Sequence, residues 1–164
     1  MSELRTNRII PRDGLTSGTF NGGGVIQVKH TAFTGTDDAT GAIATALTDF
    51  ESTYNCVITP TRSDSKILIQ GNIGGIETSA HNNYGQGILL RDSTVIISAI
   101  DYGIGFTGDS ARAGTSSSFF ILDAPATASA ITYKVQFKNA AGSGTVTTQT
   151  NSSRSAILLM EISG

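Results

Sequence analysis

Residues that could carry out nucleophilic chemistry are few in this sequence. Gly108-Asp109-Ser110 places a serine beside an acid, but a hydrolytic triad also requires a histidine as the base. The two histidines of the chain are His30, in a predicted strand, and His81, in a polar loop. No pattern for an oxyanion hole flanks the serine. We therefore predict no catalytic residue and a protein that is not an enzyme.

A glycine motif of the dinucleotide-binding type occurs once. Gly103, Gly105 and Gly108 form the pattern GxGxxG after a predicted strand. That pattern binds pyrophosphate where a helix begins at the loop, whereas residues 109–114 lead into another predicted strand. The glycines therefore predict a flexible loop between strands, and we expect no cofactor.

Metal-ligand spacing is also missing. The two histidines and Cys56 are not spaced as the ligands of a zinc site. Asp37-Asp38 could contribute to a calcium site, but oxygen ligands at alternate positions are absent from the sequence around it. We predict a solvated loop at this pair and no bound metal. Cys56 cannot form an intrachain disulfide because it is the single cysteine, and its apolar neighbours predict a buried thiol.

The composition narrows the classes of partner. Charged residues make up 15% of the 164 residues, and the formal net charge is −2. This charge creates no field that would attract nucleic acid or an anionic membrane. The chain shows no signal sequence and no apolar run approaching the ~18 residues of a membrane span. We expect a protein that is made and kept in a cytosol or released from it by lysis.

The first 24 residues differ in character from the rest. They contain an apolar pair, a proline and three arginines, and they end in consecutive glycines at positions 22–24. No helix or strand period is long enough to bury a face. We therefore expect Met1–Gly24 to be an extended arm with a glycine hinge, ordered only by contact with another molecule. Because no aromatic residues interleave the arginines, as they do in single-strand nucleic-acid sites, we expect docking on another protein through Arg5, Arg8, Ile9, Ile10, Pro11 and Arg12.

From residue 25 onward, short runs of alternating apolar and polar residues are separated by turn residues. This pattern predicts about eight to ten strands and no helix, which is typical of an antiparallel β-sandwich or jelly roll over residues 25–164. Ala42–Phe50 is ambiguous between a helical turn and a short strand. The predicted strands are Val25–Phe33, Tyr54–Thr59, Lys66–Ile76, Tyr84–Leu90, Thr94–Ile100, Ser116–Leu122, Ile131–Lys138 and Ser155–Ile162, with a short one near Val146.

The final predicted strand, Ser155–Ile162, is apolar on both of its faces. This predicts a central strand that is buried on each side. A sandwich of this length also leaves open sheet edges, which symmetric oligomers cover.

Long and short connectors alternate after Ile76. If successive strands run up and down, the long connectors Glu77–Asn83, Asp101–Thr115 and Asn139–Ser153 emerge at one end, opposite the arm. Their exposed rings and hydrogen-bond donors suit a sugar or protein surface. The residues expected to contact a host or partner are His81, Asn82, Tyr102, Phe106 and Arg112.

Several segments together resemble a family of small virion proteins of tailed phages, especially marine and cyanobacterial phages. They are LRTNRIIPRDG, the glycine hinge, SKILI, ILLRDSTVI, FFILDAPATASAITYKVQF and SAILLMEI, and the resemblance covers nearly the whole chain. The resemblance implies a short N-terminal anchor and a trimeric jelly-roll head, used as a tail fibre, knob or capsid appendage. It also implies a place in the virion, assembled in the host cytoplasm.

Two functions remain open at this point. In the first, the protein is a trimeric tail fibre for host attachment, whose arm docks on other virion proteins and whose head contacts a host glycan or protein. In the second, it is a decoration (cement) protein that stabilises a capsid. The copy number per particle distinguishes them, since a tail carries few copies and a capsid carries hundreds.

Overall fold

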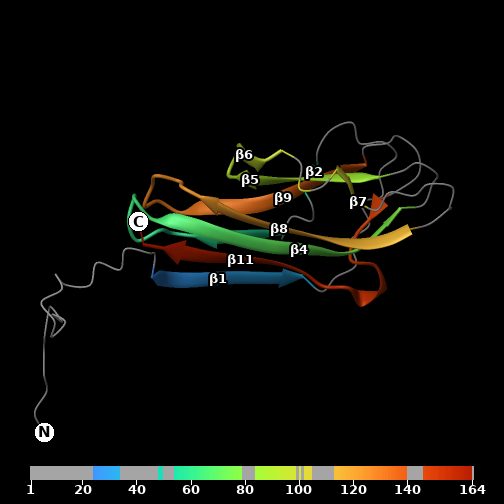
Figure 1. Cartoon of the computed structure of the whole chain (residues 1–164), viewed down its shortest axis with the longest axis horizontal. Coiled ribbons are helices and arrows are strands. Elements are labelled where there is room, and N and C mark those ends of the chain that lie inside the picture. Colours follow the sequence, from blue (N-terminus) through green and yellow to red (C-terminus); the bar gives the residue numbers. More distant parts are fainter. Residues whose placement is uncertain are drawn as a thin grey trace, which may run out of the picture.

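Alternation of apolar and polar side chains makes strands of most of the chain that the structure describes. The computed structural model describes residues 24–33, 48–49, 54–78, 84–98, 100, 102–104, 113–139 and 146–163. Within these ranges the strands form two antiparallel sheets that pack face to face, as Figure 1 shows. The predicted fold class, an all-β antiparallel sandwich of the jelly-roll type, is confirmed.

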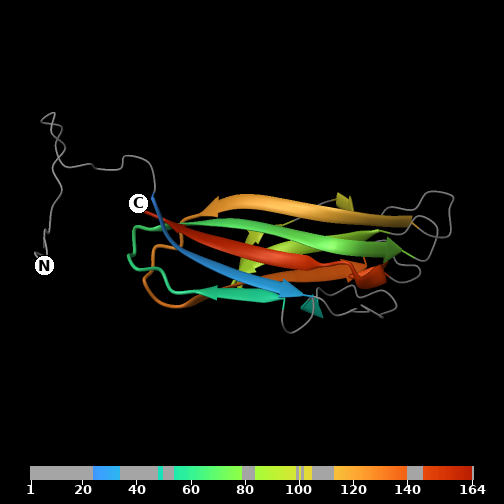
Figure 2. The same ribbon diagram turned by 90° about the horizontal axis from the view of Figure 1, so that it is seen from below.

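The first sheet has five strands. They are β1 (Val25–Phe33), β4 (Lys66–Thr78), β8 (Ala113–Asp123), β10 (Val146–Thr147) and β11 (Ser155–Ile162). β11 lies between β1 and β4, and β8 pairs with the other edge of β4. β10 pairs with the last two residues of β4. Figure 2 shows β1, β11, β4 and β8 side by side in that order.

The second sheet has six strands, most of them short. They are β2 (Thr48–Asp49), β3 (Asn55–Ile58), β5 (Gly85–Arg91), β6 (Thr94–Ile97), β7 (Tyr102–Ile104) and β9 (Ile131–Asn139). β9 pairs with β5 along one edge and with β2 and β3 along the other, while β6 and β7 follow each other along the free edge of β5. A short turn, η1 (Thr150–Ser152), in which Asn151 and Ser152 have left-handed φ values of 55° and 59°, precedes β11.

Several predicted strands differ from the observed ones at their ends. The predicted strand Thr94–Ile100 stops at Ile97, and β7 then covers part of the stretch predicted as a loop. β8 begins at Ala113, three residues before the prediction, because it pairs with the extended end of β4. β2 lies within the ambiguous segment Ala42–Phe50, of which the structure describes only these two residues.

The core lies between the sheets and receives every second side chain of the long strands. From the first sheet it takes Ile67, Ile69, Ile73, Ile76, Phe119, Ile157 and Leu159, and from the second Cys56, Ile58, Leu89, Ile131, Tyr133, Val135 and Phe137. Two glycines make room for the aromatic rings, since a Cβ on Gly71 would lie 2.2 Å from Phe119 and one on Gly85 would lie 2.2 Å from Phe137. Close packing of this kind makes each volume change costly.

The prediction that Ser155–Ile162 is buried on each side is wrong for one side. β11 is central, as predicted, and Ser155, Ile157, Leu159 and Glu161 are buried. The alternate residues, from Ala156 to Ile162, are only half-buried. They point away from the second sheet, and flanking strands shield such side chains laterally but do not cover them.

Candidate interaction surfaces

The strand registers define two ends of the sandwich. Val25 pairs with Ile162 and Ile162 with Lys66, while Ile67 pairs with Asp123. We call this the arm end, because Gly24 joins the head there. It also contains the turn 59–65, the turn 92–93 and the segment 124–130, and Ser163 N donates to Gly24 O over 3.1 Å.

A carboxylate anchors the turn 59–65 at the arm end. Glu161, on β11, is fully buried, and its carboxylate accepts from Thr61 N and Thr61 Oγ1, both over 2.7 Å, and from Gln27 Nε2 over 2.6 Å. Gln27 Nε2 also donates to Thr59 O over 2.7 Å. Burial alone would raise the pKa of Glu161, but the neighbouring donors on Ser65, Gln27 and Thr61 outweigh it and lower the pKa to about 2. The turn is thus fixed to both β1 and β11 by one ionised group.

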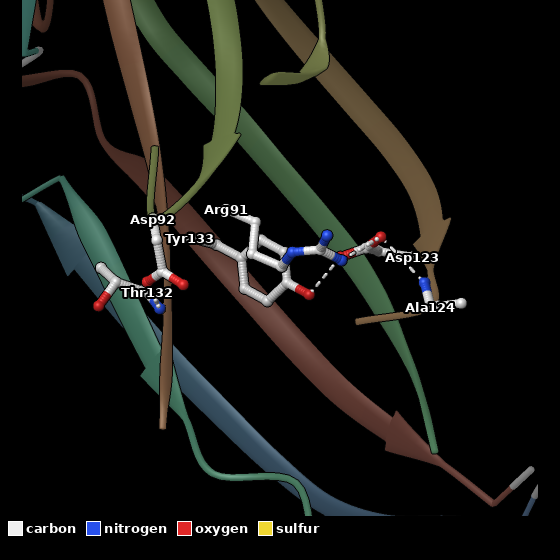
Figure 3. Close-up of polar contacts among 6 residues, drawn as sticks. All are labelled: Arg91, Asp92, Asp123, Ala124, Thr132 and Tyr133. Atoms are coloured by element: carbon white, nitrogen blue, oxygen red, sulfur yellow. Dashed lines mark hydrogen bonds and ion pairs between the residues drawn. The ribbon is translucent and has the colours of Figure 1, made fainter. Parts of the chain in front are cut away.

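An ion pair joins the two sheets at the same end (Figure 3). Arg91 Nη1, at the end of β5, lies 3.0 and 2.8 Å from the two carboxylate oxygens of Asp123, at the end of β8. Tyr133 on β9 donates its hydroxyl to Asp123 Oδ2 over 2.6 Å. Burial, with the hydrogen bond to Asp123 adding to it, raises the pKa of Tyr133. Charge-assisted hydrogen bonds of this kind are among the stronger polar contacts in proteins.

The turn between β5 and β6 is tied to β9 beside this ion pair. Asp92 N donates to Thr132 O over 2.7 Å, and Thr132 N donates to Asp92 Oδ1 over 2.9 Å. Asp92 has a φ of 51°, in the left-handed region that aspartate tolerates better than most residues. The predicted strands Tyr84–Leu90 and Thr94–Ile100 imply a short turn here, but the contacts that this turn makes across the sheet were not predicted.

The opposite end of the sandwich is where the strands bounding the long connectors meet. Thr78, the last residue of β4, pairs with Ala113 and with Val146, and Gly85 pairs with Asn139. We call this the connector end. The segments 79–83, 105–112 and 140–145 join the described strands at this end.

The predicted contact residues divide between these segments and β7. His81, Asn82, Phe106 and Arg112 lie outside the described residues. Tyr102 is not in a loop, because it belongs to β7 and its backbone pairs with Gln86 of β5. That these residues contact a host or partner stays a prediction, and so does the docking role of Arg5, Arg8, Ile9, Ile10, Pro11 and Arg12, which also lie outside the described residues.

Backbone geometry and hydrogen bonds between uncharged groups hold most of the described part of the connector end, where Asn151 Nδ2 also donates to the carboxylate oxygen Glu77 Oε1 over 3.3 Å. β4 contains a bulge between Ile73 and Ile76, where Gly75 has a φ of 59°. The segment before β11 packs into this bulge: Gln149 N donates to Gly74 O over 2.9 Å, and Thr150 Oγ1 donates to Gly75 O over 2.9 Å. Bulges of this kind bend a strand and re-aim its end.

Of the residues considered for catalysis or metal binding, the structure describes His30 and Cys56, whereas His81, Asp109 and Ser110 lie outside the described residues. His30 is exposed on β1, whereas Cys56 is buried on β3, as predicted, and its burial raises the pKa of the thiol. Across the described ranges, no three residues among His, Cys, Asp and Glu are grouped so that they could hold a metal ion. No helix in the same ranges is long and apolar enough to cross a membrane.

Sequence analysis missed one further surface, which lies on the outside of the first sheet. Phe120 and Leu122 on β8 are 67% and 52% exposed, and Val28 on β1 is 53% exposed. The half-buried Leu158 and Met160 of β11 lie between them in the sheet. The signal in the sequence is the two-sided apolar character of Ser155–Ile162, which by itself predicts burial on both sides.

The comparisons with known proteins concern the fold. The chain matches a crystal structure of the infectious bursal disease virus VP2 subviral particle with a TM-score of 0.55 and 15% sequence identity, over 95% of this chain and 37% of the VP2 chain. A structure of infectious bursal disease virus, strain Gx, matches with a TM-score of 0.49 and 14% identity, over 85% of this chain and 33% of that chain. No protein-family model matches the sequence, and the search of curated proteins gave no match. The chain thus spans little more than a third of the VP2 chain, with which it shares a β-sandwich fold.

Proposed function

We propose that this protein is a non-enzymatic structural component of a virus particle, and that it acts as a short trimeric tail fibre. Its arm, residues 1–24, docks on other virion proteins. Its head, residues 25–164, directs the connector end toward the host surface.

The observation that carries this proposal is the separation of the two ends. Gly24 joins the head at the arm end, and the strands that bound the three long connectors meet at the connector end. A protein docked through its arm therefore holds its connectors away from the docking site. Connecting segments on a rigid scaffold are where binding residues concentrate.

The fold comparison adds support for a virion role. The VP2 chain that shares this fold is part of a subviral particle. The charge of the chain adds a second argument, because a net charge of −2 does not favour a nucleic-acid partner.

The arm is tested by deleting residues 2–23 in the virus and counting this protein in purified particles by mass spectrometry. We expect the shortened head to fold but to be absent from particles. Incorporation at the normal level would contradict docking through the arm.

The connector end is tested by substituting Tyr102→Ser together with Phe106→Ser and measuring adsorption of the particles to host cells. We expect adsorption to fall by roughly tenfold or more, because each aromatic ring contributes a large contact area. Val95→Ser is the control, since Val95 is 50% exposed on β6, which pairs with the arm-end half of β5. If particles that contain the normal amount of the double variant adsorb as well as unaltered particles do, the connector end is not the host contact.

Capsid decoration is the second candidate, and the likeness to a protein of a subviral particle favours it. Under this role the arm would dock on a capsid shell and the head would stabilise it without contacting a host. Copy number decides between the two, because a tail accommodates low multiples of three or six whereas a shell accommodates hundreds. A particle reconstruction with this density at the tail alone excludes decoration.

A further inference from the structure

Side chains of β1, β11, β4 and β8 form rows across the surface of the first sheet that is turned away from the core, the surface seen in Figure 2. The registers align a wholly apolar row across all four strands, and the next row has an apolar residue on β11 and on β8. We call these two rows the outer apolar face. Its apolar members are Val28, Met160, Leu68 and Leu122 in the first row and Leu158 and Phe120 in the second.

The exposure of this face is unusual for an antiparallel sheet. The solvent side of such a sheet normally carries polar residues, yet Phe120 is 67% exposed and Val28 and Leu122 are each more than half exposed. The polar members of the two rows are His30 and Gln70, and neither row contains a lysine, an arginine or an acidic residue.

The outer surface of the second sheet provides the contrast. Tyr133, Val135 and Phe137 of β9 enter the core. The side chains that alternate with them are polar, and the described ones are Thr132, Lys134 and Gln136. The second sheet also exposes Val57 and Val95, each 50% exposed, but Val57 pairs with Thr132, and the row through Val95 and Leu90 continues to Lys134. Among the described residues, a wholly apolar row therefore runs only across the outside of the first sheet.

We infer that the outer apolar face is a contact surface between copies of this chain. A nucleic acid or an acidic protein would meet no lysine or arginine in these rows, and a glycan would meet only two polar side chains. Further copies of the chain present the same pleated apolar surface, and apolar sheet surfaces of this kind pack on one another as the layers of a β-sandwich do. The net charge of −2 per chain opposes this association only weakly.

The size of the face suits such a contact. With strands ~4.8 Å apart and ~3.3 Å per residue, four strands over the length of Ala156–Ile162, which holds the outer apolar face and one further row on each side of it, cover about 400 Å² of footprint per copy. Side-chain relief makes the accessible area larger than this footprint. Two copies together present about 800 Å² of footprint, and the side-chain relief brings their accessible area toward the lower limit for specific interfaces, about 1,200 Å² in total. We expect association in the micromolar range.

This inference rests on the proposed function only for the number of copies, three. A threefold arrangement would turn the outer apolar faces of three heads toward a shared axis, with the arms leaving at one end. The contact itself is independent of docking and of host binding, because it uses neither the arm nor the connector end.

The first test measures self-association of the full-length protein by sedimentation over a range of concentrations. We expect the unaltered protein to associate, and the double variant Val28→Glu, Leu122→Glu to raise the dissociation constant by roughly a hundredfold or more, because it buries unpaired carboxylates. Val57→Glu is the matched control: Val57 is 50% exposed against 53% for Val28, and it lies on the second sheet. A monomeric unaltered protein, or an equal loss of association in the control, overturns the inference.

A second variant covers the case in which the double glutamate variant fails to fold. Leu122→Cys is treated with a short bismaleimide crosslinker, and Val57→Cys serves as the control. Background reaction is low because Cys56 is buried. We expect covalent dimers for Leu122→Cys alone, because one accessible thiol per chain and a bifunctional reagent can link only two copies, and equal yields for both variants would refute the contact. A protein that self-associates but is missing from particles would defeat the proposed function and leave this inference intact.

Discussion

The arm end and the connector end of this sandwich are held together by different chemistry. At the arm end, ionised side chains connect neighbouring segments: Glu161 fixes the turn 59–65, and Asp123 joins Arg91 to Tyr133. At the connector end, the described contacts around Gly75 are hydrogen bonds between uncharged backbone and side-chain groups, together with residues in the left-handed conformation. The first kind depends on protonation state, whereas the second depends on the space and torsion angles available to the backbone. Substitutions and pH should therefore separate the two ends.

The largest effect is expected from Asp123→Ala at the arm end. It leaves the guanidinium of Arg91 and the hydroxyl of Tyr133 without this partner, and removing one member of a mostly buried pair costs about 3 kcal/mol of unfolding free energy. Urea denaturation measures it. Asp64→Ala is the matched control, because Asp64 pairs with Arg62 on the surface, where both side chains are more than half exposed. If Asp123→Ala and Asp64→Ala lost the same free energy of unfolding, the ion pair between the sheets would contribute no more to stability than a surface ion pair.

Next in size is Gly75→Ala at the connector end, with an expected loss of about 2 kcal/mol. A Cβ there would adopt a φ of 59° and would lie 2.7 Å from Thr150 N and from Ser153 Cβ. Gly24→Ala is the control, since a Cβ on Gly24 has no atom within 4 Å. Gly75→Ala should lose the same free energy of unfolding at pH 3 and at pH 7. A strong dependence of this loss on pH would contradict the difference in chemistry between the two ends.

The pH profile of the unaltered protein gives the third prediction. The pKa of Glu161 is about 2 in the fold against 4.5 in its unperturbed state, so its stabilisation is present above pH 4.5 and is lost as the pH falls toward 2. Converting the whole pKa shift of Glu161 into free energy of unfolding would give about 3 kcal/mol. Screening by solvent beside the exposed turn reduces this stabilisation to about 1–2 kcal/mol. Glu161→Gln should flatten this part of the profile, measured by urea denaturation between pH 2 and pH 7. If Glu161→Gln lost stability between pH 4.5 and pH 2 as the unaltered protein does, Glu161 would not be the cause of that loss.

The smallest effect is expected from Thr150→Val. It deletes the hydrogen bond from Thr150 Oγ1 to Gly75 O and keeps the shape of the side chain, at a cost of about 1 kcal/mol. Thr61→Val is the counterpart at the arm end, where the hydroxyl donates to the carboxylate of Glu161. Its cost should exceed that of Thr150→Val at pH 7 and should approach it near pH 2. Parallel behaviour of the two variants across this range would contradict the difference in chemistry between the ends.

Long apolar-rich strands could be predicted from the sequence. The limits of β1 and β11 agree with the predicted Val25–Phe33 and Ser155–Ile162, because each is an apolar-rich run bounded by glycine or polar residues. β2 and β7 are only two and three residues long, and a pattern that short carries no period. The left-handed residues Gln149, Asn151 and Ser152 were not predicted either, since glycine is the residue that signals such a conformation.

The candidate surfaces were harder to predict because they depend on which strands become neighbours. Arg91 and Asp123 meet only because β5 and β8 end at the same end of the two sheets. The apolar row from Val28 to Leu122 likewise requires the order β1, β11, β4, β8, and no local pattern fixes that order. The two-sided apolar character of β11 did indicate a second contact on the outside of the sheet. It could not distinguish burial within one chain from contact with another.

The pairing of β1 with β11 has a consequence for how the protein folds. These strands come from opposite ends of the described chain and pair along nearly their full length, and β11 is also the strand that joins β1 to β4. The central ladder of the first sheet therefore forms only after the largest loop closure in the domain. Proteins dominated by such non-local pairings have high contact order and fold in roughly milliseconds to seconds. Until β11 pairs with β4, most of one edge of β4 has an unpaired backbone, and we expect aggregation during refolding to begin at that edge.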